Sequence, residues 1–260
     1  HMRLNRFLAA AGLGSRRSCD ALIASGAVVI NGHKIDQLAT QVEDGDDVRV
    51  KGRPVRAALP VHILLNKPKG FVVTRSDERG RRTVYDLLPP EFSTLCHVGR
   101  LDKESEGLLL LTNDGALAQK LTHPSHEIEK EYEVTLDKDF KPEDIPTLLK
   151  GIYIEGGCGR FERVHIVTTK RLQVILRQGI KRQIRLMFYS MGYEVERLVR
   201  TRIGKLRDDR MPLGACRRLT KLEIGSLTGT SKKSAKPASS KPSSKRPRRV
   251  VKKATRPQQA

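Results

Sequence analysis

The sequence predicts an α+β protein in which a small two-helix module precedes a larger domain with a mixed, mainly antiparallel β-sheet and flanking helices. Near the start, apolar residues recur at helical spacing and a hairpin signal follows at Asn31-Gly32. Farther along, apolar and polar residues alternate over 128–136 and 172–176, as in strands, before a helical pattern over 180–191. Strands and helices mixed in this way indicate the α+β class.

The chain is strongly basic. It has 260 residues, with 50 Lys and Arg against 29 Asp and Glu, and a formal net charge of +21. This excess predicts a polyanionic partner. The sequence has neither a run of about 18 apolar residues nor a signal-peptide pattern, so we expect a soluble, cytoplasmic protein. Four cysteines without CxxC or zinc spacing argue against a structural metal or a disulfide framework.

The segment 229–260 consists mainly of Ser, Pro, Lys, Arg and Ala. It carries seven Lys, four Arg and no acidic residue, which leaves +10 on the preceding residues. So few apolar residues cannot offset the entropy of ordering, and we expect a disordered basic tail. It could serve to grip RNA electrostatically or merely to keep the chain soluble.

Residues 1–52 are expected to form the small module. Leu4 and Leu8 repeat at helical spacing, and a second helix is expected between Ser15 as its N-cap and Gly26 as its stop. Two short strands then flank the Asn31-Gly32 turn. The module's candidates for RNA contact are Arg3, Arg16, Arg17, Asn31 and Lys34. An ordinary solvated surface is the alternative interpretation of these charges.

Residues 53–61 are expected to link this module to a domain over 62–228. In that domain, a short strand over 62–66 ends at a Pro-Gly turn, and a fully buried strand is expected over 108–111. The turn at Asp114 should lead into a short helix over 116–121.

Asp102 lies in the loop before the buried strand, within Gly99-Arg100-Leu101-Asp102. Loops positioned by scaffold strands commonly carry catalytic groups. A carboxylate flanked by basic residues in so cationic a chain is therefore our first candidate for chemistry on nucleic acid.

Tyr132 lies in the alternating strand 128–136 and shares a face with Lys130, Val134 and Leu136. We expect it to point to the core side of the sheet. It fits two descriptions, an ordinary buried aromatic residue or a surface on which an extruded base stacks.

The helix expected over 180–191 places Lys181 and Arg185 one turn apart, where like charges repel. An anionic partner would relieve that repulsion. Arg185 lies at the edge of the apolar stripe and could reach a site where the helix packs on the sheet, although it could equally be a snorkelling surface arginine.

Two parts of the chain resemble known families. Gly14-Ser15-Arg16-Arg17 and Val28-x-Ile30-Asn31-Gly32 are similar to the S4 RNA-binding domain, a two-helix and hairpin module that docks on structured RNA. Residues 62–227 resemble the RsuA-type branch of the pseudouridine synthases. The motifs that carry this second resemblance are Lys67-Pro68-x-Gly70, Gly99-Arg100-Leu101-Asp102, Lys130-x-Tyr132-x-Val134 and Gly179-x-x-Arg182-Gln183-Ile184-Arg185.

The resemblance implies that Asp102 is the catalytic aspartate, that Tyr132 stacks on the target base and that Arg185 pairs with the aspartate. It also implies that Lys67 and Arg100 hold the active-site loop or the RNA backbone. The same motifs add Lys181, Arg182 and Gln183 to the RNA-binding candidates. The implied reaction converts a uridine of ribosomal RNA, most simply that of the large subunit, into pseudouridine. We expect a monomer that needs no cofactor and no metal.

Three alternatives remain at this point. The first is a synthase for small-subunit (16S) ribosomal RNA, because the branch contains both specificities. The second is a non-catalytic RNA-binding or ribosome-assembly protein, which the presence of Asp102, Tyr132 and Arg185 disfavours. The third is a DNA-binding protein, which the lack of heptads, zinc spacing and a recognition-helix motif disfavours.

Overall fold

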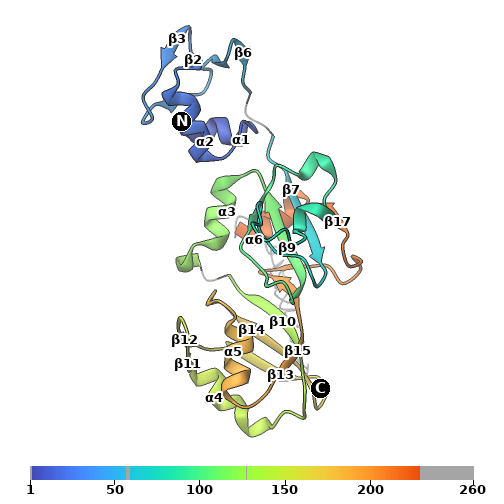
Figure 1. Ribbon diagram of the computed structural model, residues 1–260. Coiled ribbons are helices and arrows are strands. Elements are labelled where there is room, and N and C mark those ends of the chain that lie inside the picture. The colour runs from blue at the N-terminus through green and yellow to red at the C-terminus, as the bar shows by residue number, and fades with distance from the viewer. Residues whose placement is uncertain (1, 57–58, 127, 229–260) are drawn as a thin grey trace, which may run out of the picture.

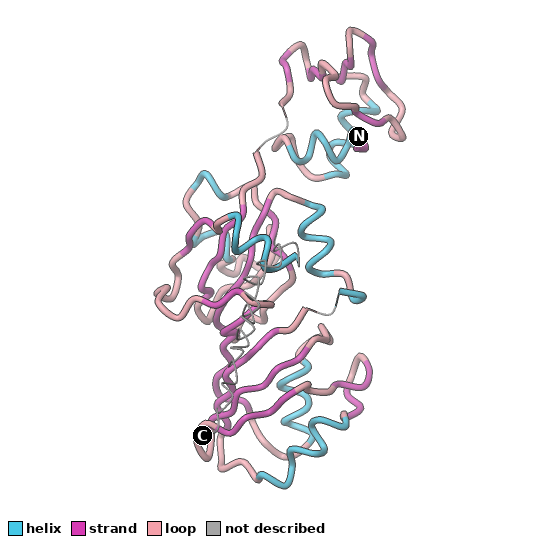
Figure 2. Tube along the Cα trace, turned by 180° about the vertical axis from the view of Figure 1, so that it is seen from behind, coloured by secondary structure: helices cyan, strands magenta, loops and turns pink. Residues whose placement is uncertain are grey.

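The computed structural model describes residues 2–56, 59–126 and 128–228, and shows an elongated molecule with a small N-terminal module and a larger domain (Figure 1). Seen from behind, the two parts are again separate and joined by one short segment (Figure 2). The expected tail over 229–260 lies outside the described residues. No helix in the described part of the chain has the length and apolar character needed to cross a membrane.

The N-terminal module has the predicted two helices and hairpin. Ser15 caps the second helix by accepting a hydrogen bond of 3.1 Å from the Ser18 N–H. Asn31 and Gly32 have φ angles of 51° and 84°, as a two-residue hairpin turn requires. The sequence did not reveal the further strands that complete the module. Its elements are α1 (Leu4–Ala10), α2 (Arg16–Ala24), a sheet in the order β3 (His33–Ile35), β2 (Val28–Ile30), β5 (Val48–Val50) and β6 (Arg53–Pro54), and the pair β1 (Met2–Arg3) and β4 (Gln41–Val42).

Both ends of the expected linker, 53–61, are in contact with neighbouring elements. β6 pairs with β5, and the Val55 N–H donates to the Val48 carbonyl at 2.7 Å, so the module's sheet reaches Val55. On the other side, the Asn113 side chain accepts from the Val61 N–H at 2.7 Å and donates to the Leu59 carbonyl at 3.0 Å. The module's sheet thus reaches into the expected linker from one side, and contacts of the larger domain reach into it from the other.

The larger domain is built on one mixed sheet of nine strands. The order is β13 (Arg163–Ile166), β14 (Arg171–Leu176), β10 (Lys130–Leu136), β15 (Val195–Ile203), β9 (Glu106–Thr112), β7 (His62–Lys67) and β17 (Cys216–Arg218), with β8 (Cys96–Val98) on β9 and β16 (Leu206–Arg207) on β15. β15 and β9 are parallel and the other pairs are antiparallel. The predicted mixed, mainly antiparallel sheet is confirmed.

Helices cover both faces of this sheet. α3 (Gly115–Thr122) and α6 (Lys221–Thr228) lie on one core, and α4 (Ile145–Lys150) and α5 (Gln183–Ser190) lie on the other, beside the hairpin of β11 (Ile152–Ile154) and β12 (Gly157–Gly159). Single 3₁₀ turns occur at Val84–Leu87, Pro90–Phe92, Pro124–His126 and Pro142–Asp144.

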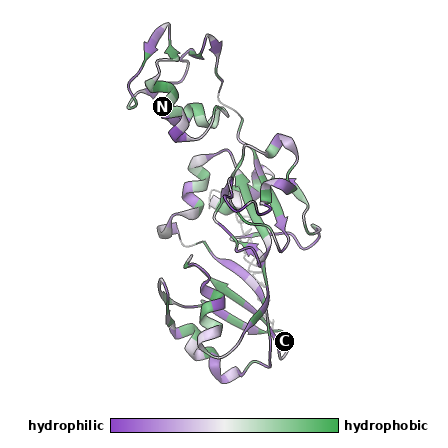
Figure 3. Ribbon diagram, viewed as in Figure 1, coloured by the Kyte–Doolittle hydropathy of each residue, from purple (hydrophilic) through white to green (hydrophobic). Residues whose placement is uncertain are grey.

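β9 is the buried strand predicted from its apolar run. Leu108 and Leu110 pack in the core with α3, whereas Leu109 and Leu111 pack in the core with α5. Because successive side chains point to opposite faces, a strand covered on both sides is apolar at every position. The hydropathy colouring shows β9 as a largely apolar strand (Figure 3).

The helix expected over 180–191 is shorter than its apolar pattern. α5 begins at Gln183, and the residue before it, Arg182, has a φ of 56° in the left-handed region. Lys181 thus precedes the helix, and the prediction that it lies one turn from Arg185 on a common helix is wrong. Ile180 matches the helical period only by chance, because the backbone turns at Arg182 before the helix starts.

Candidate active site

A cavity of about 1000 Å³ lies where the loop before β9, the strands β10 and β15 and the segment before α5 meet. The three predicted catalytic residues, Asp102, Tyr132 and Arg185, all line it. The candidates that line the cavity with them are Arg100, Lys181, Arg182 and Gln183. Segments more than 80 residues apart in sequence are thus brought to one site, as the motifs predicted.

The loop that carries Asp102 is held by its backbone. The Asp102 carbonyl accepts from the Ser105 N–H at 3.0 Å, and the Lys103 carbonyl accepts from the Gly70 N–H at 2.9 Å. The Glu104 carbonyl accepts from Arg185 Nη2 at 3.2 Å. The Ser105 carbonyl also accepts a hydrogen bond, from Lys67. Each backbone carbonyl from 102 to 105 therefore has a hydrogen-bond donor, which holds the loop in one conformation.

Lys67 is a part of this support and not an RNA contact. Its side chain is completely buried, and Nζ donates to the carbonyls of Pro68 at 3.0 Å, Lys103 at 3.2 Å and Ser105 at 2.5 Å. Burial lowers the pKa of Lys67 to about 8, and the nearby carboxylates of Glu104 and Asp102 offset part of that effect. The proposal that Lys67 holds the loop agrees with the geometry, whereas its place among the RNA-binding candidates is wrong because phosphate cannot reach it.

Asp102 forms an ion pair with Arg182 and not with Arg185. Arg182 Nη1 lies 3.7 Å from Asp102 Oδ2, and the two side chains are 47% and 34% exposed. Arg185 instead donates to the Val195 carbonyl at 2.9 Å through Nη1, in addition to the Glu104 carbonyl. The expected pairing of Arg185 with the aspartate is therefore wrong in this structure, because two carbonyls occupy both ends of the guanidinium fork.

Arg185 still interacts electrostatically with the Asp102 carboxylate. Burial and the charge of Arg182 lower the pKa of Arg185, while the carboxylates of Asp102 and Glu104 raise it in part. Arg185 thus fixes the Asp102 loop against the strand β15 and adds positive charge beside the carboxylate.

Tyr132 points to the buried side of β10, as predicted, and is only 8% exposed. Its hydroxyl accepts a hydrogen bond of 3.4 Å from Arg200 Nη1. Arg200 lies opposite Tyr132 in the register between β10 and β15, is 4% exposed, and donates from Nε to the Leu108 carbonyl at 2.7 Å. Sequence reasoning missed Arg200, because an arginine within a strand reads as a solvent-facing residue until its neighbours in the sheet are known.

Three other cavity candidates differ in exposure. Arg100 and Lys181 are exposed and remain candidates for RNA contact. Gln183 is 3% exposed, and its Nε2 donates to the Arg160 carbonyl at 3.2 Å and to Gln178 Oε1 at 2.8 Å. The side chain ties the start of α5 to the segment after β12, and its contact with RNA stays a prediction.

The candidates in the N-terminal module lie on its surface. Arg3, Arg16, Arg17, Asn31 and Lys34 are all exposed, which leaves the predicted RNA contacts open. Asn31, however, already has intramolecular partners. Its Nδ2 donates to Asp46 Oδ1 at 2.7 Å and its Oδ1 accepts from the Asp47 N–H at 2.9 Å, so it braces the hairpin against the loop before β5.

The start of β9 contains two further residues that sequence reasoning missed. Buried Glu106 accepts two hydrogen bonds from Arg197, from Nε at 2.9 Å and from Nη2 at 3.1 Å. Gly107 has a φ of 107°, and a Cβ there would meet the Arg200 carbonyl oxygen and lie 2.6 Å from the Arg200 nitrogen. Only glycine permits β9 to approach β15 this closely next to the Asp102 loop.

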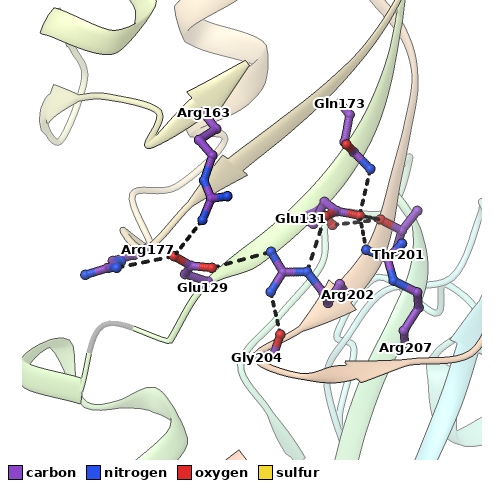
Figure 4. A network of polar contacts seen from close by, with 9 residues as sticks. All are labelled: Glu129, Glu131, Arg163, Gln173, Arg177, Thr201, Arg202, Gly204 and Arg207. Atoms are coloured by element: carbon purple, nitrogen blue, oxygen red, sulfur yellow. Dashed lines mark hydrogen bonds and ion pairs between the residues drawn. The ribbon is translucent and has the colours of Figure 1, made fainter. Parts of the chain in front are cut away.

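The opposite face of β10 carries a network of ion pairs (Figure 4). Buried Glu131 accepts from Arg207 at 2.6 Å, Arg202 at 3.3 Å and Gln173 at 2.9 Å. Glu129 pairs with Arg177 at 3.2 Å and with Arg163 at 3.8 Å. Glu129 and Glu131 therefore point to the face of β10 opposite Tyr132, which we call the outer face, and their carboxylates are bound there by arginines.

Comparison with known proteins defines the class of this chain. The family model described as RNA pseudouridylate synthase matches residues 61–190, and the S4 domain model matches residues 2–48. The chain belongs to the RNA pseudouridine synthase family and begins with an S4 domain.

Individual relatives agree with this assignment. An uncharacterized RNA pseudouridine synthase of Mycobacterium tuberculosis is 40% identical over 87% of this chain and 92% of its own length. The ribosomal large subunit pseudouridine synthase B of Vibrio cholerae is 37% identical over 86% of this chain and 74% of its own length. A crystal structure of a pseudouridylate synthase superposes with a TM-score of 0.64 and 28% identity over 87% of this chain and all of that one.

The described residues contain no group of three or more His, Cys, Asp or Glu side chains placed to bind a metal ion.

Proposed function

We propose that this protein isomerises a specific uridine of large-subunit ribosomal RNA to pseudouridine, with Asp102 as the catalytic residue. One observation carries the proposal. Among the described residues that line the cavity, Asp102 is the sole carboxylate, and it lies on a loop whose carbonyls are all hydrogen-bonded. A cavity of about 1000 Å³ has room for a nucleoside that has left its stack.

The side chains suit this reaction. Isomerisation detaches the base at N1 and reattaches it through C5, without a redox change and without an external group, so the reaction requires no cofactor. Arg182 forms an ion pair with Asp102, and Arg185 adds positive charge beside it. A carboxylate ion can attack carbon or remove a proton. Attack at C1′, abstraction of the C2′ proton and addition at C6 all begin from that carboxylate. Tyr132 offers an aromatic surface for the extruded base.

RNA affinity comes from the exposed basic residues. The S4 domain presents Arg3, Arg16 and Arg17, and the cavity mouth presents Arg100 and Lys181. Phosphate contacts of this kind position the RNA without reading its sequence, and the cavity then selects the base. We divide the chain accordingly into an RNA-binding module up to Val55 and a catalytic domain from Leu59 to Thr228. The name of the Vibrio cholerae relative supports the large subunit as the source of the RNA.

The test is the Asp102→Asn variant, assayed with a pseudouridine-specific chemical readout on ribosomal RNA from cells that lack the protein. The expected result is one new pseudouridine with the wild type and none with Asp102→Asn, while RNA affinity stays unchanged. Glu104→Gln is the matched control, since it neutralises an exposed carboxylate of the same loop. Full activity of Asp102→Asn would refute the catalytic assignment, and an unchanged map with the wild type would refute the enzymatic one.

A further inference from the structure

The cations around the cavity fall into two groups. Seven basic side chains line it, namely Arg100, Lys130, Arg177, Lys181, Arg182, Arg185 and Arg200. Those at the mouth, such as Arg100 and Lys181, are exposed and suit phosphate groups. Lys130 and Arg200 are withdrawn from solvent and flank Tyr132, so they adjoin the place of the base and not that of the RNA backbone.

Arg200 has unused hydrogen-bonding capacity. Nε and Nη1 have the Leu108 carbonyl and the Tyr132 hydroxyl as partners, but the buried Nη2 has none. Lys130 is half-buried, and its Nζ donates to the Arg177 carbonyl at 3.2 Å. Burial and, to a lesser extent, the positive charge of Arg200 lower the pKa of Lys130 to about 8.

Neither cation has a carboxylate partner within 4 Å among the described residues. Glu129 and Glu131 flank Lys130 in sequence, yet they point to the other face of β10, where Arg202 and Arg207 bind them (Figure 4). Two like charges, one buried and one half-buried, are costly without a counterion. The arrangement therefore favours the arrival of negative charge beside Tyr132.

We infer that Arg200 and Lys130 stabilise the uracil ring as an anion while it is detached from the sugar. The inference rests on the proposed function and identifies the charged species that the cavity binds. When the C1′–N1 bond breaks, both electrons remain with the ring, and the negative charge spreads from N1 to the O2 and O4 carbonyl oxygens. C5 then supplies the pair that forms the C1′–C5 bond, the C5 hydrogen leaves as a proton, and N1 takes up a proton. Fixed cations in a dry site stabilise such transient charge strongly.

Barbiturate tests this inference without RNA. It is a pyrimidine ring with carbonyl groups at C2 and C4, as in uracil, and a third at C6, and it is an anion at neutral pH, whereas uracil is neutral. Calorimetric titration of the full-length protein should show barbiturate binding at least about tenfold more tightly than uracil. Arg200→Met and Lys130→Met should each abolish that preference. Arg163→Met is the control, since it removes an exposed arginine from the outer face. Equal affinities in the wild type, or tighter binding of inorganic phosphate at the same residues, would overturn the inference.

Kinetics separate this inference from the proposed function. In single-turnover reactions, Lys130→Met and Arg200→Met should slow pseudouridine formation by about a hundredfold, the cost of losing one charge-stabilising donor, with RNA affinity within about twofold of the wild type. Circular dichroism identifies a variant that fails to fold. The comparison of barbiturate with uracil in the wild type tests the inference even if both variants fail to fold. Wild-type rates in both variants would refute the role of the cations and leave Asp102 in place. A wild type that forms no pseudouridine yet prefers barbiturate would refute the proposed function alone.

Discussion

Gly107→Ala should destabilise the catalytic domain more than any other single methyl group added near the site. A Cβ at Gly107 would meet three backbone atoms of Arg200, with the nitrogen at 2.6 Å and the carbonyl carbon at 2.9 Å, and backbone cannot turn aside as a flexible side chain can. The φ of 107° adds conformational strain of about 1–3 kcal/mol for a residue with a side chain. Overpacking at a rigid contact costs about 1–3 kcal/mol more. Their sum, about 2–6 kcal/mol, is a large part of the stability of a typical domain, which is about 5–15 kcal/mol.

Urea denaturation followed by far-ultraviolet circular dichroism measures this effect, since the chain has no tryptophan. The midpoint of the catalytic-domain transition should fall, while the transition of the S4 domain should stay where it is. Gly115→Ala is the matched control, because a Cβ at that first residue of α3 meets nothing within 4 Å and its φ is ordinary. It should leave stability unchanged or raise it by up to about 1 kcal/mol. Equal midpoints for Gly107→Ala and the wild type would refute the close approach of β9 to β15.

The remaining predictions concern residues around the site and in the module. Lys67 has a pKa of about 8 in the folded protein and 10.5 in the unfolded chain, so between these pH values the unfolded state binds more protons. The free energy of unfolding should therefore rise with pH in this range. Lys67→Met should remove that rise in denaturation curves measured from pH 7.5 to 10.5. Lys181→Ala should lower the slope of log affinity against log salt by about 1 in RNA-binding titrations, because Lys181 is exposed at the cavity mouth. Arg185→Ala should leave that slope unchanged and reduce turnover, because two carbonyls hold its guanidinium group, and the reverse result would contradict these assignments. Asn31→Gly keeps the positive φ of the turn but removes two hydrogen bonds, so it should lower the stability of the S4 domain by about 1–3 kcal/mol. It should not change the slope of log RNA affinity against log salt, and a changed slope would indicate that Asn31 contacts RNA.

The sequence predicts correctly those turns and strands that depend only on a few neighbouring residues. The Asn31-Gly32 turn and the apolar run of β9 depend on a few neighbouring residues, and both lie where we expected them. The start of α5 depends on the left-handed backbone at Arg182 and on the hydrogen bonds of Gln183 to Arg160 and Gln178. The spacing of apolar residues contains neither of these, so the helix predicted from it began three residues too early. The family motifs likewise assigned Asp102 and Tyr132 to one site, and both line the cavity.

The two largest errors have one physical origin. Lys67 and Arg200 are charged residues, which sequence reasoning assigns to the surface, but each is buried and donates to carbonyls of distant strands and loops. Such carbonyl partners have no signature in the sequence, because every residue supplies the same acceptor. The pairing of Asp102 with Arg182 was missed for a related reason. Which of two nearby arginines reaches a carboxylate is decided by how the other one's donors are already occupied.

The same distinction limits what the net charge of +21 says about RNA binding. Counterion release requires cations that reach phosphate, and a buried cation bonded to carbonyls contributes nothing to it. Lys67 and Arg185 act on the Asp102 loop, and Arg202 and Arg207 balance Glu131 on the outer face. The salt dependence of RNA binding should therefore follow the exposed residues of the S4 domain and the cavity mouth. The buried cations should affect the rate of the chemical step, where their charge is not screened by salt.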